Sequence, residues 1–147
     1  MKKVMVGMSG GVDSSVSALL LRNMGYDVTG ATLKLFSNED IIEAEKTNKT
    51  CCALSDVEDA RSVAYKLGFE HLVFNFKDKF RECVMNQFAE CYLEGGTPNP
   101  CIECNRHIKF DKMLLRAKEL DFDYIATGHY ARMVNGHLLR GIDKNKD

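Results

Sequence analysis

A short apolar run, two glycines and a helical pattern of apolar residues follow one another within residues 4–24, and this order constrains the fold more than any other part of the sequence. The run from Val4 to Met8 is typical of a buried strand. The apolar residues beyond the glycines recur at helical spacing: Val16, Leu19, Leu20 and Met24. The pattern predicts a strand that turns sharply into a helix at Gly10 and Gly11.

This turn is typical of a site for phosphate groups. The first backbone N–H groups of a helix have no partner within the helix, and the helix dipole is positive at that end, so an anion held there is stabilised twice. Gly10 and Gly11 let the backbone approach a phosphate closely. The stretch lacks the Gly-Lys-Ser/Thr ending of the commonest phosphate loop and the third glycine of the dinucleotide fingerprint. The alternative is a glycine turn that Asp13 or Ser14 merely caps.

Length and composition predict a single globular domain over residues 1–147. Hydrophobic residues make up 45% of the chain, and the net charge is only −1, so contact with nucleic acid needs a local basic face. The apolar run after Met1 is too short for a signal peptide, and no stretch approaches the ~20 apolar residues that cross a bilayer. We therefore expect a cytoplasmic protein without a membrane partner, with its six cysteines as thiols, ligands or nucleophiles.

Predicted strands and helices alternate along most of the chain. Strands are expected at 27–35, 71–76 and 123–127, and helices at 55–67, 80–92 and 108–120. The residues expected on the inward helix faces are Phe80, Cys83, Val84, Phe88, Cys91, Phe110, Met113, Leu114 and Ala117. An Asn135-Gly136 turn predicts a type I′ hairpin near the end. This alternation indicates an α/β fold, a three-layer sandwich whose mostly parallel sheet carries helices on both faces.

In such sheets ligands bind beyond the carboxyl ends of the strands. The rule brings three segments around one crevice: Ser9 to Ser15, Leu33 to Leu35, and Thr127 to His129. An adenine base is expected near Leu33 and Gly128.

A second motif, Cys101-x-x-Cys104, follows a loop that contains two prolines and two glycines. A thiol at a helix N-terminus has a stabilised thiolate, and Cys104, expected nearer the helix start, is the better predicted nucleophile. Alternatives remain open. Zinc needs two more ligands, for which the adjacent Cys51 and Cys52 are a poor pair, and an iron-sulfur cluster needs another cysteine from elsewhere. Ordinary buried thiols account well for Cys83 and Cys91.

Taken jointly, five motifs in this order resemble the tRNA-specific 2-thiouridylase family, whose PP-loop belongs to the ATP pyrophosphatase superfamily. They are Gly7 to Ser15, Cys51-Cys52 with Asp56 to Arg61, Thr97 to Pro100 leading to Cys104-Asn105, Ile108 to Phe110, and Thr127 to Tyr130. The resemblance covers the whole chain but about the first two fifths of a family member. The family's middle tRNA-binding domain, C-terminal β domain and second catalytic cysteine lie beyond it.

The resemblance implies that sulfur replaces the 2-oxygen of the tRNA wobble uridine after ATP adenylates the base, with Mg²⁺ as cofactor and a sulfur-donor protein as partner. Residues expected to hold ATP are Met8, Ser9, Gly10, Gly11, Asp13, Ser14, Ser15, Leu33 and Gly128. Cys104 is expected to carry persulfide sulfur. Asn99, Pro100 and Cys101 are expected to contact the flipped base, and His129 the tRNA. The alternative for His129 is a satisfied histidine at a strand end.

One residue departs from the family pattern, because many members have Asp where this chain has Cys101. Either Cys101 joins the sulfur relay as a second catalytic thiol, or the pair holds a metal or an iron-sulfur cluster. A helix face bears five cations that contact either RNA phosphates or solvent: Arg106, Lys109, Lys112, Arg116 and Lys118.

Two other functions remain open: a PP-loop synthetase that adenylates a small metabolite, and a non-catalytic adenine-nucleotide-binding module. This chain alone is expected to bind ATP without completing thiolation.

Overall fold

The computed structural model describes residues 1–36 and 54–145. Its strands are β1 (Lys3–Gly7), β2 (Asp27–Lys34), β3 (His71–Asn75), β4 (Tyr124–Ala126), β5 (Ala131–Val134) and β6 (His137–Arg140). Its helices are α1 (Val12–Asn23), α3 (Leu54–Leu67), α4 (Lys77–Phe80), α5 (Asn86–Leu93), α6 (Pro100–Cys104) and α7 (Met113–Glu119), with π-helical segments η1 (Arg81–Met85) and η2 (Asn105–Lys112). The predictions for Cys51 and Cys52 lie outside the described residues.

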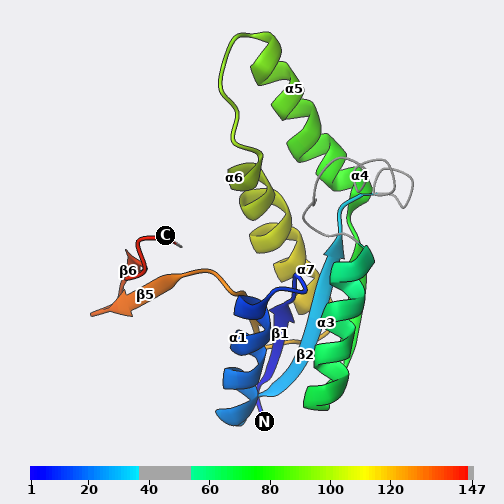
Figure 1. Ribbon diagram of the computed structural model, residues 1–147, viewed down its shortest axis with the longest axis vertical. Coiled ribbons are helices and arrows are strands. Elements are labelled where there is room, and N and C mark those ends of the chain that lie inside the picture. The colour runs from blue at the N-terminus through cyan, green and yellow to red at the C-terminus, as the bar shows by residue number, and fades with distance from the viewer. Residues whose placement is uncertain (37–53, 146–147) are drawn as a thin grey trace.

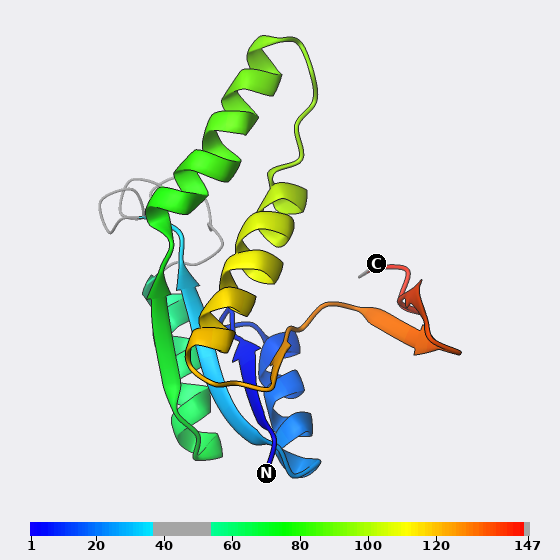
Figure 2. The ribbon, with the colours of Figure 1, turned by 180° about the vertical axis from the view of Figure 1, so that it is seen from behind.

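The first four strands form one parallel sheet in the order β3-β2-β1-β4 (Figure 1). Val4 of β1 lies between Val28 of β2 and Tyr124 of β4, and this register brings the carboxyl ends of the strands to one edge. All four predicted strands are present, within one or two residues of the expected bounds. Helices cover both faces, so the predicted three-layer α/β fold is confirmed (Figure 2).

Alternate residues of the strands face two separate apolar clusters. On one face, α1 and α3 cover a cluster built from Val4, Val6, Met8, Ala18, Val28 and Ala60. On the other face, η1, α6, η2 and α7 cover a cluster built from Met5, Ala31, Leu33, Leu35, Phe80, Val84, Cys104, Ile108, Met113 and Ala117. The sheet is thus buried on both sides, as a parallel sheet requires.

Helix α1 is present as predicted, but its expected apolar face was wrong. The apolar residues that recur at helical spacing are exposed: Val16, Leu19, Leu20 and Met24. The buried residues are the small ones, Ser14 and Ala18. Small side chains let the start of the helix lie close to the turn that leaves β1.

The chain from Lys77 to Leu93 runs through α4, η1 and α5 as a rising helical arm (Figure 1). Phe80 and Val84 are buried against the sheet, as predicted. The expected inward face ends there, because α5 has no buried residue and Phe88 is exposed. Cys83 and Cys91 are half-buried, and Cys83 packs against the core as predicted.

The returning helix begins at Pro100, not at residue 108 as expected, and continues through η2 and α7 to Glu119 (Figure 2). Asn99 caps it, since its side-chain oxygen accepts a hydrogen bond from the Cys101 N–H at 3.1 Å. Met113 and Ala117 are buried as predicted. Phe110 and Leu114 are exposed, contrary to prediction.

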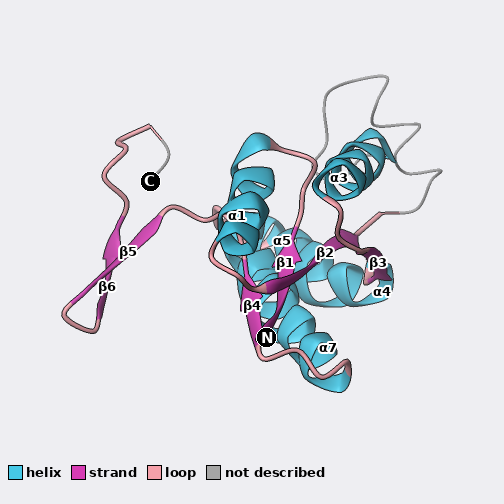
Figure 3. Cartoon of the chain, turned by 90° about the horizontal axis from the view of Figure 1, so that it is seen from below, coloured by secondary structure: helices cyan, strands magenta, loops and turns pink. Residues whose placement is uncertain are grey.

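Strands β5 and β6 form the predicted hairpin, which lies beside the sheet and is fully exposed (Figure 3). Its turn residues have positive φ, 51° at Asn135 and 79° at Gly136, as a type I′ turn requires. No helix of the described residues is long and apolar enough to span a membrane.

Candidate functional site

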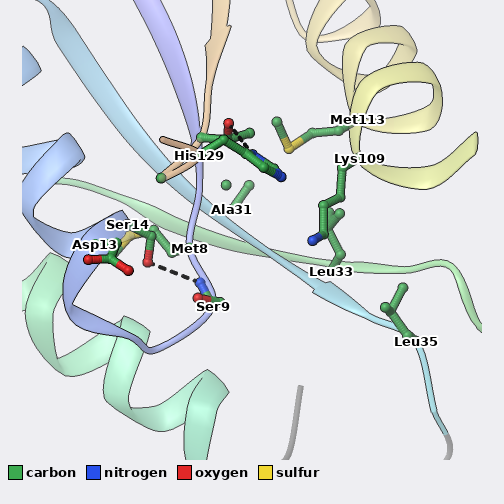
Figure 4. Close-up of a pocket in the computed structure, with 13 residues that line it drawn as sticks. Met8, Ser9, Asp13, Ser14, Ala31, Leu33, Leu35, Lys109, Met113 and His129 are labelled. Atoms are coloured by element: carbon green, nitrogen blue, oxygen red, sulfur yellow. Dashed lines mark hydrogen bonds between the residues drawn. The ribbon is translucent and has the colours of Figure 1, made fainter. Parts of the chain in front are cut away.

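A cavity of about 230 Å³ opens at the carboxyl edge of the sheet (Figure 4). Its lining comes from three segments far apart in sequence and from the returning helix. The lining residues are Gly7, Met8, Ser9, Asp13, Ser14, Ala31, Leu33, Leu35, Lys109, Met113, Thr127, Gly128 and His129. The predicted crevice between the β1 turn, the end of β2 and the segment after β4 is therefore present.

The turn after β1 leads into α1 through Gly11, which occupies the N-cap position without a side-chain cap. Asp13 and Ser14 follow inside the first helical turn, so neither is the N-cap, although the Ser14 hydroxyl accepts a hydrogen bond from the Ser9 N–H of the turn. Gly10 has φ +76°, and a Cβ there would lie 2.6 Å from the backbone oxygen of Asp56. Only glycine fits this position without displacing α3.

Six of the nine residues predicted to hold nucleotide line the cavity: Met8, Ser9, Asp13, Ser14, Leu33 and Gly128. Gly10, Gly11 and Ser15 lie in the turn and the first helical turn but outside the lining. Their backbone still shapes the loop, since the Ser14 hydroxyl donates to the Gly11 carbonyl at 3.2 Å.

The far wall of the cavity packs directly against this loop. A Cβ at Gly128 would lie 2.8 Å from the backbone nitrogen of Ser14. Two residues further on, the Tyr130 hydroxyl donates to Asp13 Oδ1 at 2.9 Å. The segment after β4 is thus tied to the start of α1.

His129 lines the cavity and links it to the returning helix. Its Nδ1 lies 2.7 Å from Thr127 Oγ1, its Nε2 lies 3.3 Å from Asn105 Oδ1, and its ring packs against Phe110. Burial lowers the pKa of His129, and the positive charge of Lys109 lowers it further. The imidazole is therefore neutral near pH 7. These hydrogen bonds agree with the alternative, a histidine satisfied within the fold. The predicted contact of His129 with tRNA stays a prediction.

Lys109 reaches from η2 into the cavity (Figure 4). The sequence placed Lys109 on a basic helix face and did not predict that it lines the cavity. The neighbouring cations form surface ion pairs instead: Arg106 with Glu103, Lys112 with Asp111, and Arg116 with Glu119. Lys109 differs from these cations because it lies one helical turn before Met113, which also lines the cavity.

The two cysteines of the C-x-x-C motif differ in accessibility. Cys101 is exposed in the first turn of α6, whereas Cys104 is only 8% exposed and belongs to the apolar cluster that includes Leu33 and Leu35. The prediction that Cys104 lies nearer the helix start is therefore wrong. Neither cysteine lines this cavity, but Cys104 shares its apolar cluster with four residues that do: Ala31, Leu33, Leu35 and Met113.

Asn99 and Pro100 line a second cavity, beside Phe88 of the helical arm. His129, assigned to the same substrate, instead lies in the first cavity. The described residues contain no group of three or more His, Cys, Asp or Glu side chains arranged to hold a metal ion.

Comparison with known proteins places this chain in a family. A family model described as the tRNA methyl transferase HUP domain matches residues 2–147. The chain is 56% identical over 132 residues to tRNA-specific 2-thiouridylase MnmA of Clostridioides difficile, covering 90% of this chain and 36% of that protein. It is 54% identical over 146 residues to the protein of the same name from Clostridium acetobutylicum, covering 99% and 41%. The chain thus spans about two fifths of these relatives' length.

Among solved structures, a protein described as a predicted subunit of tRNA methyltransferase from Methanocaldococcus jannaschii shares the fold. The TM-score is 0.58 at 21% identity, with 99% of this chain and 60% of that chain covered. The HUP-domain match extends over nearly every residue of the chain. The predicted resemblance to the tRNA-specific 2-thiouridylases is confirmed. The chain belongs to the tRNA methyl transferase HUP domain family.

Proposed function

We propose that this chain is the ATP-using and sulfur-carrying part of a tRNA-uridine 2-sulfurtransferase, an enzyme that replaces the 2-oxygen of the wobble uridine by sulfur. One observation carries the proposal. The cavity at the sheet edge is joined, through the His129–Asn105 hydrogen bond, to the helix that bears Cys101 and Cys104. An activated oxygen and a sulfur nucleophile can then meet on one substrate.

The cavity suits a nucleoside triphosphate. Backbone N–H groups at the start of α1 and the Lys109 ammonium favour phosphate oxygens, while Leu33, Ala31 and Met113 offer apolar surface for a base. The Asp13 carboxylate is the type of oxygen ligand that Mg²⁺ prefers, and bound Mg²⁺ would neutralise phosphate charge. Gly10, Gly11 and Ser15 complete the loop around the phosphates.

The first reaction step makes the uridine 2-oxygen a leaving group. That oxygen attacks the α-phosphorus of ATP, an O–P bond forms, and the bond to pyrophosphate breaks. Lys109 stabilises the negative charge that develops on the phosphoryl oxygens. The product is an adenylated base.

The second step uses the two thiols of the motif. The terminal sulfur of a Cys104 persulfide attacks carbon 2 of the base, and AMP departs. The Cys101 thiolate then attacks Cys104 Sγ, forming a disulfide between the two cysteines and releasing the thiouridine. Residues three apart on a helix share a face, so this pair is suitably placed. Because Cys104 is buried, the step requires α6 to move outward.

The substrate is a tRNA whose target base leaves its stack, since no side chain reaches carbon 2 inside a stacked anticodon. Asn99 and Pro100 would contact that base, with His129 contacting the tRNA from the cavity side. A sulfur-donor protein would load Cys104. We expect the reaction in the cytoplasm, where thiols remain reduced.

An iron-sulfur cluster fits the described residues poorly. Cys101 and Cys104 supply two thiolates, and no third ligand gathers with them among residues 1–36 and 54–145. No step is therefore assigned to a cluster. Absorption spectra and metal analysis after anaerobic purification would detect one, and a cluster bound at this pair would contradict the persulfide role.

The test uses a full-length protein that contains this chain. We expect Cys104→Ser to abolish formation of 2-thiouridine while leaving ATP affinity unchanged, and Cys83→Ser, a half-buried control, to retain both. Cys101→Ser is expected to accumulate a tRNA–protein disulfide that a thiol reductant releases, and normal release in this variant would assign the resolving thiol to the family's second catalytic cysteine. Undiminished thiolation by Cys104→Ser would refute the proposal.

A second arm of the test addresses the other functions. Pyrophosphate release that needs a small metabolite and no tRNA would identify a metabolite-adenylating synthetase. ATP binding without any pyrophosphate release would identify a simple nucleotide-binding module. The isolated chain is expected to bind ATP and not to thiolate tRNA, because the remaining three fifths of its relatives' length would supply the grip on tRNA.

A further inference from the structure

A chain of polar groups from buried Thr32 to half-buried His71 lies behind the turn after β1, outside the steps of the proposed reaction. The Thr32 hydroxyl donates to the Met8 carbonyl at 2.9 Å, and His71 Nε2 lies 2.8 Å from the same hydroxyl oxygen. Thr32 is 1% exposed, on the face of β2 that meets α3. Burying polar groups costs free energy of folding unless they are hydrogen-bonded, as these groups are.

The direction of the hydrogen bonds follows from their protons. Thr32 has one hydroxyl proton and gives it to Met8, so His71 must donate from Nε2. Nδ1 of His71 is buried and has no hydrogen-bond partner among the described residues. The imidazole therefore donates one hydrogen bond, from Nε2, and this bond holds the Thr32 hydroxyl in a single orientation.

These contacts fix the peptide unit between Met8 and Ser9. Its carbonyl accepts from Thr32, and its N–H, on Ser9, donates to Ser14 Oγ at 3.3 Å (Figure 4). The preceding N–H, on Met8, donates to the Ala31 carbonyl at 2.8 Å. The first peptide of the loop is thus held from β2 on one side and from α1 on the other.

Gly30 provides the space for this arrangement. A Cβ there would lie 2.7 Å from Met8 Sδ and 3.2 Å from His71 Cδ2. The His71 ring lies over this strand position, where Gly30 pairs with His71 itself in the β2–β3 register. The sequence of β2 therefore admits the histidine and the loop side by side.

We infer that Thr32 and His71 are positioning residues for the triphosphate: they hold the Met8–Ser9 peptide so that the loop N–H groups face the phosphates before ATP arrives. The inference rests on the proposed ATP-binding function and deepens it. Preorganised N–H donors bind an anion without first paying for loop ordering. Adenosine has no phosphate, so its binding should depend less on the orientation of these N–H groups.

The experiment compares ATP and adenosine binding to this chain by calorimetry. Thr32→Val removes the hydroxyl with little change of shape, and we expect it to weaken ATP about three- to tenfold, the loss of one hydrogen bond, while adenosine affinity holds. Thr32→Ser restores the hydroxyl and is expected to recover ATP binding. Thr29→Val, at a buried threonine on the opposite face of β2, is the matched control and should bind both ligands normally. Equal weakening of ATP and adenosine, or no weakening, would overturn the inference.

A second measurement keeps the inference testable if the wild-type chain binds no ATP, a result that by itself contradicts the proposed function. Amide hydrogen exchange at Ser9 to Ser15 is expected to quicken in Thr32→Val and in His71→Phe, and to stay unchanged in Thr29→Val. Unaltered exchange of the loop in both variants would show that Thr32 and His71 do not position it.

Discussion

The turn from Met8 to Ser14 and the helical arm from Lys77 to Leu93 lie at the same edge of the sheet but are built in opposite ways. Met8 and Ser14 of the loop are buried, and side chains from β2 and β3 support the backbone between them. The arm carries exposed apolar residues, among them Tyr92 and Leu93, and the nearby Cys101 is exposed too. The turn is held from two sides, whereas much of the arm is exposed to solvent.

The contrast suggests a division of labour under the proposed function. A rigid loop favours tight and selective phosphate binding, because its donors are already oriented. The arm contacts α6 through η1, so a movement of this loosely packed arm when a large substrate docks would help to expose the buried Cys104. Four pairs of measurements would break or sharpen this contrast.

The largest expected effect is a difference in the free energy of unfolding between a substitution in the cavity lining and one in the arm. Met113 is fully buried beneath the cavity, and Met113→Ala is expected to lower the free energy of unfolding by about 2–5 kcal/mol. Leu93 on α5 is 85% exposed, and Leu93→Ala should change it by less than about 0.5 kcal/mol. Urea unfolding followed by circular dichroism measures both. Similar losses would show that the arm is packed as firmly as the core.

The next effect concerns loop shape. Gly10 and Gly25 both have positive φ, but nothing lies within 4 Å of a Cβ at Gly25, whereas a Cβ at Gly10 meets the backbone of Asp56. Alanine at either position costs about 1–2 kcal/mol of strain. Only Gly10→Ala should also displace the loop and weaken ATP more than about tenfold. Normal ATP affinity in Gly10→Ala would mean that the loop is not preformed.

A smaller effect tests the charge on the cavity wall. Lys109→Met is expected to weaken ATP about tenfold, because a charge-assisted hydrogen bond to phosphate is lost, and to leave adenosine binding intact. Lys118→Met on the exposed side of α7 serves as the control. Calorimetric titrations of both ligands measure the difference. If the two variants behave alike, Lys109 belongs to the solvated helix face.

The smallest effect is a pH dependence that centres on the loop side. Burial is the main cause that lowers the pKa of His71 and of His129 in the fold. The unfolded chain therefore binds more protons near pH 6.5, and the free energy of unfolding should decrease as the pH falls from about 7 towards the lowered pKa values. Urea unfolding across that range measures it, and replacing both histidines by glutamine should flatten the curve. A slope that survives the replacement would assign it to other groups.

Sequence patterns predicted the sheet and most of the segments that line the first cavity, and the reason is physical. Parallel strands converge at their carboxyl ends, so Ser9, Leu33 and Gly128 had to meet once the strands were identified. The support behind the loop was missed, because Thr32 and His71 are ordinary residues in strand patterns. Only the three-dimensional register brings their side chains to Met8.

Helical periodicity failed where packing departs from the regular α-helix. In α1 the small residues Ser14 and Ala18 face the core while Leu20 faces outward, so hydrophobicity alone chose the wrong face. In η2 the π-helical turn changes the number of residues per turn, and Phe110, placed inward by α-helical spacing, lies exposed beside His129.

The same π-helical turn fixes how the two ends of the long returning helix face relative to each other. In an α-helix each residue turns the chain by about 100°. If the 8 residues from Asn105 to Lys112 were α-helical instead, each would turn the chain through a larger angle, and Cys104 would face another direction with Met113 still anchored under the sheet. The wider π-helical turn thus determines the direction that Cys104 faces, while Met113 at the other end of the helix packs in the core.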